Sequence, residues 1–174
     1  MAQFTCGEIH NLERDKKMGL DMYLSARKYV SGYSHSSQDE QKKYADILAV
    51  SGLNKSDFDG ESPSAEVKLT VGYWRKANAI HNWFVDNVQG GVDECQRAYV
   101  EREKLQELKD VCDEVLGNAT KAHELLPTQD GFFFGGTDYD EWYHASVKQT
   151  SEMLGKILSN PKFADFDFEY QSSW

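Results

Sequence analysis

The alternation of apolar and polar residues predicts three strands. Leu20–Val30 is rich in apolar and aromatic residues at strand spacing, and Gly32 closes it. Apolar and polar residues also alternate along Glu66–Trp74, which predicts a half-buried strand. At the end of the chain, aromatic and acidic residues alternate along Phe166–Tyr170. We predict that this last strand lies at an edge of the sheet, because its acidic face discourages further pairing.

Two helices are predicted, one before and one after the second strand. Ser37 and Glu40 have the spacing of a capping box, and Gly52 stands where a helix would end in the left-handed conformation. The second helix follows Trp74 directly, carries apolar residues at helical spacing and ends at Gly90.

Two further helices are predicted in the second half of the chain. Apolar residues from Leu105 to Ala122 recur at helical spacing, and Pro127 stops this helix. The last helix follows Thr137 and Asp140, which again have capping-box spacing, and it ends at Pro161. The order of elements predicts an α+β fold, with a small antiparallel or mixed sheet of about three strands covered by about four helices.

The length of the chain, 174 residues, is that of one domain. Residues 1–17 are polar and follow neither the strand period nor the helix period. We therefore predict an N-terminal extension over residues 1–17, either a flexible tail or a short accessory helix. A single α+β domain is predicted over residues 18–174.

Charge and cysteine content restrict the partners and the compartment. The formal net charge of −10 repels phosphate backbones and anionic membranes, so we expect neither direct nucleic-acid binding nor membrane association. The three cysteines, Cys6, Cys95 and Cys112, have no paired spacing, which favours reduced thiols. Because the start of the chain also lacks an apolar signal core, we expect a cytoplasmic protein.

The sequence contains no familiar catalytic motif. Gly-x-Ser-x-Gly, the phosphate-binding loop and the dinucleotide fingerprint are all missing. The five histidines lack the spacing of metal ligands, so we expect no metal and no cofactor. Asp140 and His144 lie one helical turn apart and could form a carboxylate–imidazole pair. A solvent-exposed pair with no chemical role has the same spacing, so we expect a binding protein rather than an enzyme.

The first candidate site is the tetrapeptide Tyr73-Trp74-Arg75-Lys76, where a strand leads into a helix. Cations are unfavourable at a helix N-terminus, whose unpaired N–H groups attract anions. A bound phosphate or carboxylate would explain Arg75 and Lys76 at this position, with Tyr73 or Trp74 stacking on a ring. His81 follows about two turns into the helix. The alternative is that Asp21 or Glu66 pairs with these cations across the sheet.

The second candidate site is the segment from Phe132 to Tyr143, which includes Phe133, Tyr139 and Trp142. Three consecutive phenylalanines cannot all point into one core from an extended segment, so at least one is expected to meet a ligand, a partner or another subunit. The acidic residues at the start of the following helix argue against phosphate there. They suit a cation, a hydroxyl-rich ligand or a basic protein partner. The alternative is a loop packed beneath the last helix.

Several segments resemble a family of small tailed-phage and prophage proteins. They are Met18-Gly-Leu-Asp-Met-Tyr-Leu, Tyr73-Trp-Arg-Lys-Ala-Asn-Ala-Ile-His-Asn-Trp-Phe-Val, Leu125-Leu-Pro-Thr, Gly131-Phe-Phe-Phe-Gly, Tyr139-Asp-Glu-Trp-Tyr and Tyr170-Gln-Ser-Ser-Trp174. The resemblance runs from Met18 to the last residue, so it implies that residues 1–17 lie outside the shared domain. It implies a phage origin, and it carries no established activity.

From these observations we expect a phage-encoded accessory protein of the host cytoplasm that binds a small anionic, nucleotide-like ligand and sequesters a host defence signal. Arg75, Lys76 and His81 would contact the phosphate, and Trp74, Tyr139 and Trp142 the ring. One alternative is an acidic inhibitor of a host nucleic-acid-binding or defence enzyme, and another is an unrecognised enzyme that uses Asp140 and His144. The partner is then a small anion or a host protein, and the sequence leaves homo-oligomerisation open.

Overall fold

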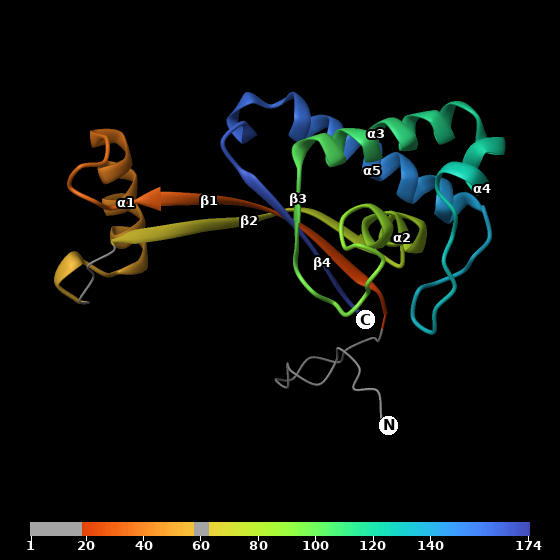
Figure 1. Cartoon of the computed structure of the whole chain (residues 1–174), viewed down its shortest axis with the longest axis horizontal. Coiled ribbons are helices and arrows are strands. Elements are labelled where there is room, and N and C mark those ends of the chain that lie inside the picture. The colour runs from red at the N-terminus through yellow and green to blue at the C-terminus, as the bar shows by residue number, and fades with distance from the viewer. Residues whose placement is uncertain (1–18, 58–62) are drawn as a thin grey trace, which may run out of the picture. The chain divides into compact units, whose positions relative to one another are not determined.

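The computed structural model describes residues 19–57 and 63–174, which form an α+β fold (Figure 1). The described residues contain one four-stranded antiparallel sheet and five α-helices, so the predicted fold class is confirmed. The strands are β1 (Asp21–Ser31), β2 (Ser64–Arg75), β3 (Ala98–Val100) and β4 (Asp167–Ser173), and their order in the sheet is β2-β1-β4-β3. The predicted extension over residues 1–17 lies outside the described residues.

The helices are α1 (Gln38–Ser51), α2 (Asn78–Asn87), α3 (Arg102–Gly117), the single turn α4 (Ala122–Leu125) and α5 (Glu141–Ser159). Short 3-10 turns occur at Lys55–Asp57, Ala119–Lys121 and Pro161–Phe163. The four helical regions predicted from the sequence are thus confirmed, and the long third region is divided into α3 and α4.

The C-terminal strand β4 lies inside the sheet, so its predicted position at an edge is wrong. The three-residue strand β3, which no alternation predicted, covers it and places Ala98 opposite Tyr170 in antiparallel register. The acidic residue Glu169 of β4 is almost buried, and Arg97 lies 3.9 Å from its carboxylate. This compensation allows an acidic strand to be paired on both sides.

The ends of two helices test the predicted caps. Ser37 and Glu40 form the expected capping box, and Gly52 ends α1 with a φ of 73°. The cap of α5 was predicted wrongly, because Asp140 itself is the N-cap rather than the N3 partner of Thr137. Its carboxylate accepts hydrogen bonds from two N–H groups of the first turn, which the positive end of the helix dipole favours.

The described chain divides into two compact units. Arg27–Leu69 form the smaller unit, and the described residues up to Ala26 and from Thr70 onward form the larger one. The smaller unit has its own apolar core around Tyr44 and Leu48 of α1 and Val30 of β1. That residues 18–174 fold as a single domain stays a prediction.

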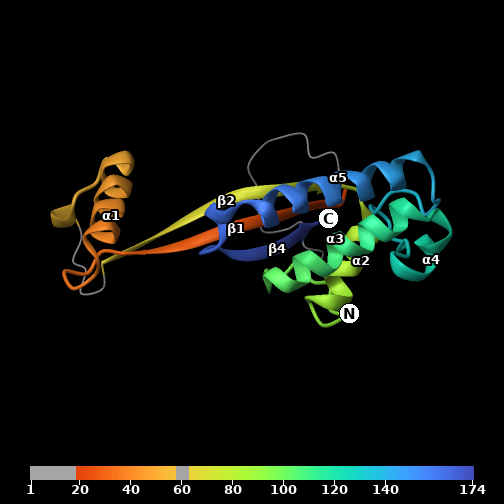
Figure 2. The same ribbon diagram turned by 90° about the horizontal axis from the view of Figure 1, so that it is seen from above.

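In the larger unit, helices pack on the sheet through large aromatic side chains. Trp74 of β2 is buried, and its Nε1 donates a hydrogen bond to Thr150 Oγ1 of α5 at 2.8 Å. Phe84 of α2 stacks on Tyr170 of β4 with ring centroids 3.9 Å apart. Helix α3 packs against α5, and Figures 1 and 2 show the two running side by side. The end of β2 and the start of α2 are thereby held beside α5.

The cysteines depart from the sequence-based expectation of three reduced thiols. Cys95 is disulfide-bonded, so the expectation is wrong for this residue. Cys112 is a free thiol in the apolar stripe of α3, where burial raises its pKa to about 12. A thiol with so high a pKa stays protonated and unreactive at neutral pH.

Candidate functional site

A cavity of about 450 Å³ lies in the larger unit, where the end of β2 and the first turn of α2 face the loop before α5. Its lining residues are Arg75, Lys76, Ala77, Asn78, Ala79, Thr128, Gly135, Gly136, Asp138, Asp140, Trp142, Tyr143, Ala145, Ser146 and Gln149. We call this space the α2 cavity. It brings together parts of both segments that the sequence singled out.

Lys76 is the most unusual residue of the α2 cavity. Its φ is 55°, in the left-handed region that costs an ordinary residue about 1–2 kcal/mol. The Lys76 N–H donates to the Leu20 carbonyl at 2.8 Å, which fixes this turn between β2 and α2. With the other described residues, the Lys76 side chain forms no hydrogen bond or ion pair. A strained backbone therefore presents an exposed ammonium group at the cavity.

Helix α2 begins at the cavity without a side-chain cap. Ala77 occupies the N-cap position and has no hydrogen-bonding side chain, and the first turn carries no acidic residue. The N–H groups of the first turn of a helix have no partner within the helix, and they carry the positive end of its dipole. Because Ala77, Asn78 and Ala79 line the cavity, this positive end faces it.

Asn78 fixes the opposite wall of the cavity. Its side chain is 4% exposed, and its Nδ2 donates to the carbonyls of Phe134 at 3.2 Å and Gly136 at 2.8 Å. Its Oδ1 accepts a hydrogen bond from the Gln129 N–H at 3.3 Å. One amide thus holds both ends of a loop that has no regular secondary structure.

Gly135 allows this loop to approach Lys76. Its φ is 93°, and a Cβ at this position would lie 3.2 Å from the Cβ of Lys76. A side chain here would be strained by the backbone and crowded by its neighbour. The close contact between the loop and the strand–helix turn therefore depends on glycine.

The segment that leads into α5 contributes acidic and aromatic groups to the cavity. Asp140 uses Oδ1 to cap α5, accepting from Trp142 N–H at 2.9 Å and Tyr143 N–H at 3.0 Å. Asp138 is exposed and forms no hydrogen bond or ion pair with another described residue. Trp142 is 83% exposed at the rim. The cavity thus joins a cationic segment to an acidic one beside a large exposed ring.

Arg75 reaches the cavity but is already engaged by an acid. Its Nη1 lies 2.9 and 3.1 Å from the two carboxylate oxygens of Asp21. Tyr73 also donates a hydrogen bond to Asp21, and this bond and burial raise the pKa of the Tyr73 hydroxyl. Glu66 pairs with Arg27 instead. The alternative explanation, pairing with an acid across the sheet, therefore holds for Arg75, and Asp21 is the acid.

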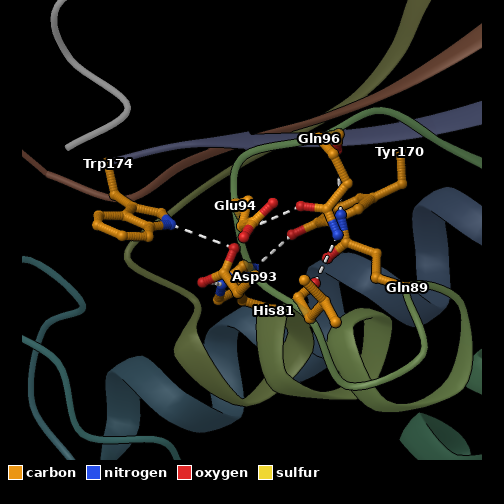
Figure 3. A network of polar contacts seen from close by, with 8 residues as sticks. His81, Gln89, Asp93, Glu94, Gln96, Tyr170 and Trp174 are labelled. Carbon is orange, nitrogen blue, oxygen red and sulfur yellow. Dashed lines mark hydrogen bonds and ion pairs between the residues drawn. The ribbon is translucent and has the colours of Figure 1, made fainter. Parts of the chain in front are cut away.

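His81 belongs to a buried polar network, shown in Figure 3. Its side chain is fully buried, with Nδ1 2.7 Å from the Tyr170 hydroxyl and Nε2 2.9 Å from Asp93 Oδ2. The indole N–H of Trp174 donates to Asp93 Oδ1 at 3.3 Å. Burial opposes ionisation of Asp93, yet the hydrogen bonds from His81 and Trp174 hold its pKa below the ordinary value. Burial also raises the pKa of Tyr170.

Of the eight predicted ligand-binding residues, Arg75, Lys76 and Trp142 line the α2 cavity. The other five, Tyr73, Trp74, His81, Phe133 and Tyr139, are not among its lining residues. Trp74 and His81 lie in the core, and Tyr73 is exposed on the sheet beside Tyr23. Phe133 contacts Phe132, and Tyr139 lies between His123 and Tyr143. The structure thus brings together one part of each predicted segment.

Asp140 and His144 have separate environments. The Asp140 carboxylate caps α5, and the ring of His144 lies edge-on against Tyr143 with centroids 5.2 Å apart. Among the described residues, the side chains of Asp140 and His144 form no hydrogen bond with each other. The helical spacing is as predicted, but it does not produce a contact between the two groups.

Sequence reasoning did not select Asn78 or Gln149 as ligand-binding residues, although both line the cavity. Asp138 lies in the second predicted segment, among the acidic residues noted at the start of the last helix. Gln149 is placed by tertiary packing, since its Nε2 donates to the Tyr73 carbonyl at 3.1 Å across the helix–sheet interface. The sequence carries no local signal for such a contact. Asn78 is one of several polar residues of α2, so the local pattern did not distinguish it.

Comparison with family models, with curated proteins and with solved structures finds no match for this chain. The resemblance to tailed-phage proteins therefore stays a prediction. Within residues 19–57 and 63–174, no helix is long and apolar enough to cross a membrane. Over the same residues, no group of three or more His, Cys, Asp or Glu side chains is arranged to hold a metal ion.

Proposed function

We propose that this protein binds a small anionic ligand of the nucleotide type in the α2 cavity. The proposal rests on three features of the cavity that are unfavourable for the stability of the free protein. They are the left-handed backbone of Lys76, its exposed ammonium group and the uncapped start of α2. Residues with a strained backbone are found most often at functional sites. A bound phosphate would satisfy the N–H groups of the first turn and compensate the charge of Lys76.

The remaining lining suits the rest of a nucleotide. A volume of about 450 Å³ lies within the range of small-molecule sites. Trp142 exposes 83% of its surface at the rim, and an indole ring is a good stacking platform for a base. The biological role we propose is sequestration of a host defence signal by a phage-encoded protein in the host cytoplasm, which rests on the resemblance alone.

Ligand-induced stabilisation tests this function. Thermal unfolding of the full chain would be followed with a panel of mononucleotides, cyclic nucleotides and dinucleotides. A ligand at about 100 times its Kd should stabilise the fold by about 2.7 kcal/mol. Lys76→Ala should abolish this gain, while Lys162→Ala, which removes an exposed lysine that does not line the cavity, should leave it unchanged. A panel that shifts nothing, or a Lys76→Ala variant that keeps the whole gain, would rule the function out.

A second candidate function is an acidic inhibitor of a basic host enzyme. Phe132 is 94% exposed and Trp142 is 83% exposed, and the segment between them contains acidic residues but no lysine or arginine. Such a surface suits a cationic partner. The two functions differ in Phe132, which does not line the α2 cavity. Phe132→Ala should weaken a salt-sensitive complex with a host enzyme but should leave nucleotide binding unchanged.

A further inference from the structure

The α2 cavity has an uneven charge that phosphate binding alone does not explain. Lys76 and the start of α2 supply positive charge, whereas Asp138 and Asp140 line the same space. Asp140 is engaged in capping α5, but Asp138 forms no hydrogen bond or ion pair with another described residue. A ligand that carried only negative charge would be repelled by Asp138.

The chemistry of a carboxylate restricts what can lie beside Asp138. An ionised carboxylate only accepts hydrogen bonds, so a group that contacts it favourably must be a donor. The ligand must therefore carry donors close to its anionic group. A ribonucleotide meets this condition, because the hydroxyls of its ribose lie between the phosphate and the base.

The base would then reach Trp142 at the rim of the cavity, since Asp138, Asp140 and Trp142 belong to one short segment. A smaller zwitterion, such as an amino acid, would also offer an anion and a donor. It would leave Trp142 without a stacking partner and much of a cavity of about 450 Å³ unfilled. The combination of cation, carboxylate and exposed indole thus favours a ribonucleotide.

We infer that Asp138 selects ribonucleotides by accepting hydrogen bonds from the ribose hydroxyls, with the phosphate at Lys76 and the base on Trp142. This inference rests on the proposed function and adds to it the sugar as the discriminating group. The protein binds ribonucleotides more tightly than their dideoxy analogues, and more tightly than the phosphate part alone.

Asp138 can be altered without touching the fold around it. Asp138→Asn keeps the size of the side chain and removes its charge, while Asp140 continues to cap α5. Asp130→Asn is a matched control, because Asp130 is an exposed acid of the same loop that does not line the cavity. The same change in net charge is thus made inside and outside the cavity.

The test is a calorimetric titration of the full chain with three kinds of probe. These are the common ribonucleoside diphosphates, their 2′,3′-dideoxy counterparts and inorganic pyrophosphate. We expect the wild type to bind its best ribonucleotide about tenfold more tightly than the dideoxy analogue, as charge-assisted hydrogen bonds allow. In Asp138→Asn this preference should fall, because the amide oxygen is an uncharged and weaker acceptor, and pyrophosphate should bind more tightly because a like charge has been removed. Asp130→Asn should behave as the wild type.

Each contrary outcome has a distinct meaning. If Asp138→Asn tightens ribonucleotides and pyrophosphate alike, Asp138 only repels anions, and the inference fails while the proposed function stands. Equal binding of ribonucleotide and dideoxy analogue by the wild type overturns the inference in the same way. If no nucleotide of either kind binds the wild type, the proposed function fails and the inference fails with it.

Discussion

Lys76 has two features that suit ligand binding but lower the stability of the free protein. Its left-handed backbone and its exposed ammonium at the positive end of α2 are both unfavourable for the free protein. Cys95 is the other described non-glycine residue with positive φ, and it is disulfide-bonded. The strain at Lys76 has no such covalent support.

Replacing Lys76 separates the strain from the charge. Glycine adopts the left-handed conformation without strain, so Lys76→Gly removes the strain whereas Lys76→Ala keeps it. Both substitutions remove the cation. We therefore expect the glycine variant to be more stable than the alanine variant by about 1 kcal/mol, measured by urea unfolding. Neither variant should bind the nucleotide. Equal stability of the two variants would show that the backbone of Lys76 is unstrained.

The two tryptophans Trp74 and Trp142 should respond in opposite ways to substitution. Trp74 is buried and bonded to Thr150, so Trp74→Phe should lower the free energy of unfolding by about 2 kcal/mol and leave ligand affinity unchanged once folded. Trp142 is 83% exposed, so Trp142→Ala should change stability little and weaken nucleotide binding. Unfolding and titration of both variants check this contrast. If folded Trp74→Phe lost affinity for the nucleotide and Trp142→Ala did not, the base would not stack on Trp142.

At the scale of elements, local patterns in the sequence predicted most helices and strands but not their neighbours. The capping box of α1 and the strand β2 follow from local features of the sequence, and both elements were predicted correctly. The inner position of β4 depends on β3, a three-residue strand far away in the sequence. Such pairing is decided by long-range packing, which no short window of sequence contains.

The candidate site was predictable to the same extent. Two segments were singled out, and each supplies residues to the α2 cavity. The alternation along β2, with apolar residues at Val67, Leu69 and Val71, would put Trp74 on the other, polar face, yet Trp74 is buried and Leu69 is 47% exposed. Trp74 is buried because α5 covers that face of the sheet, a fact of tertiary structure.

Asn78 connects α2 to the loop that forms the far wall of the cavity. Asn78→Ala removes the donors of two loop carbonyls, so we expect a loss of about 2 kcal/mol in the free energy of unfolding. Amide hydrogen exchange should accelerate over residues 128–136, while α3 stays protected. Exchange that is unchanged in this loop would mean that Asn78 does not hold it.

At the scale of the whole molecule, the buried network around His81 links the fold to pH. The pKa of Asp93 is lowered in the folded state, so its contribution to stability is present above the pKa of an unfolded aspartate, about 3.9. This contribution is lost as the pH falls through the still lower pKa of the folded state. Asp39 also has a lowered pKa, but it lies exposed beside Lys43.

Acid unfolding should therefore be sensitive to Asp93. We expect the stability of the wild type to fall as the pH drops below about 4, and Asp93→Asn to be less stable at neutral pH but to show a shallower loss. Urea unfolding over a series of pH values measures both effects. Asp39→Asn is the exposed control and should change the slope little. An identical slope in wild type and Asp93→Asn would contradict the role of this network.

The central claim, that a nucleotide binds in the α2 cavity, is tested most directly by NMR of the tryptophan indole N–H groups. The chain has 4 tryptophans, and Trp142 alone among them lines the cavity. On addition of the ribonucleotide that stabilises the protein most, we expect the Trp142 indole signal, assigned from Trp142→Phe, to shift. The Trp74 signal should stay in place, because its N–H is bonded to Thr150 in the core. A titration that moves other indole signals and leaves that of Trp142 unchanged would contradict the claim.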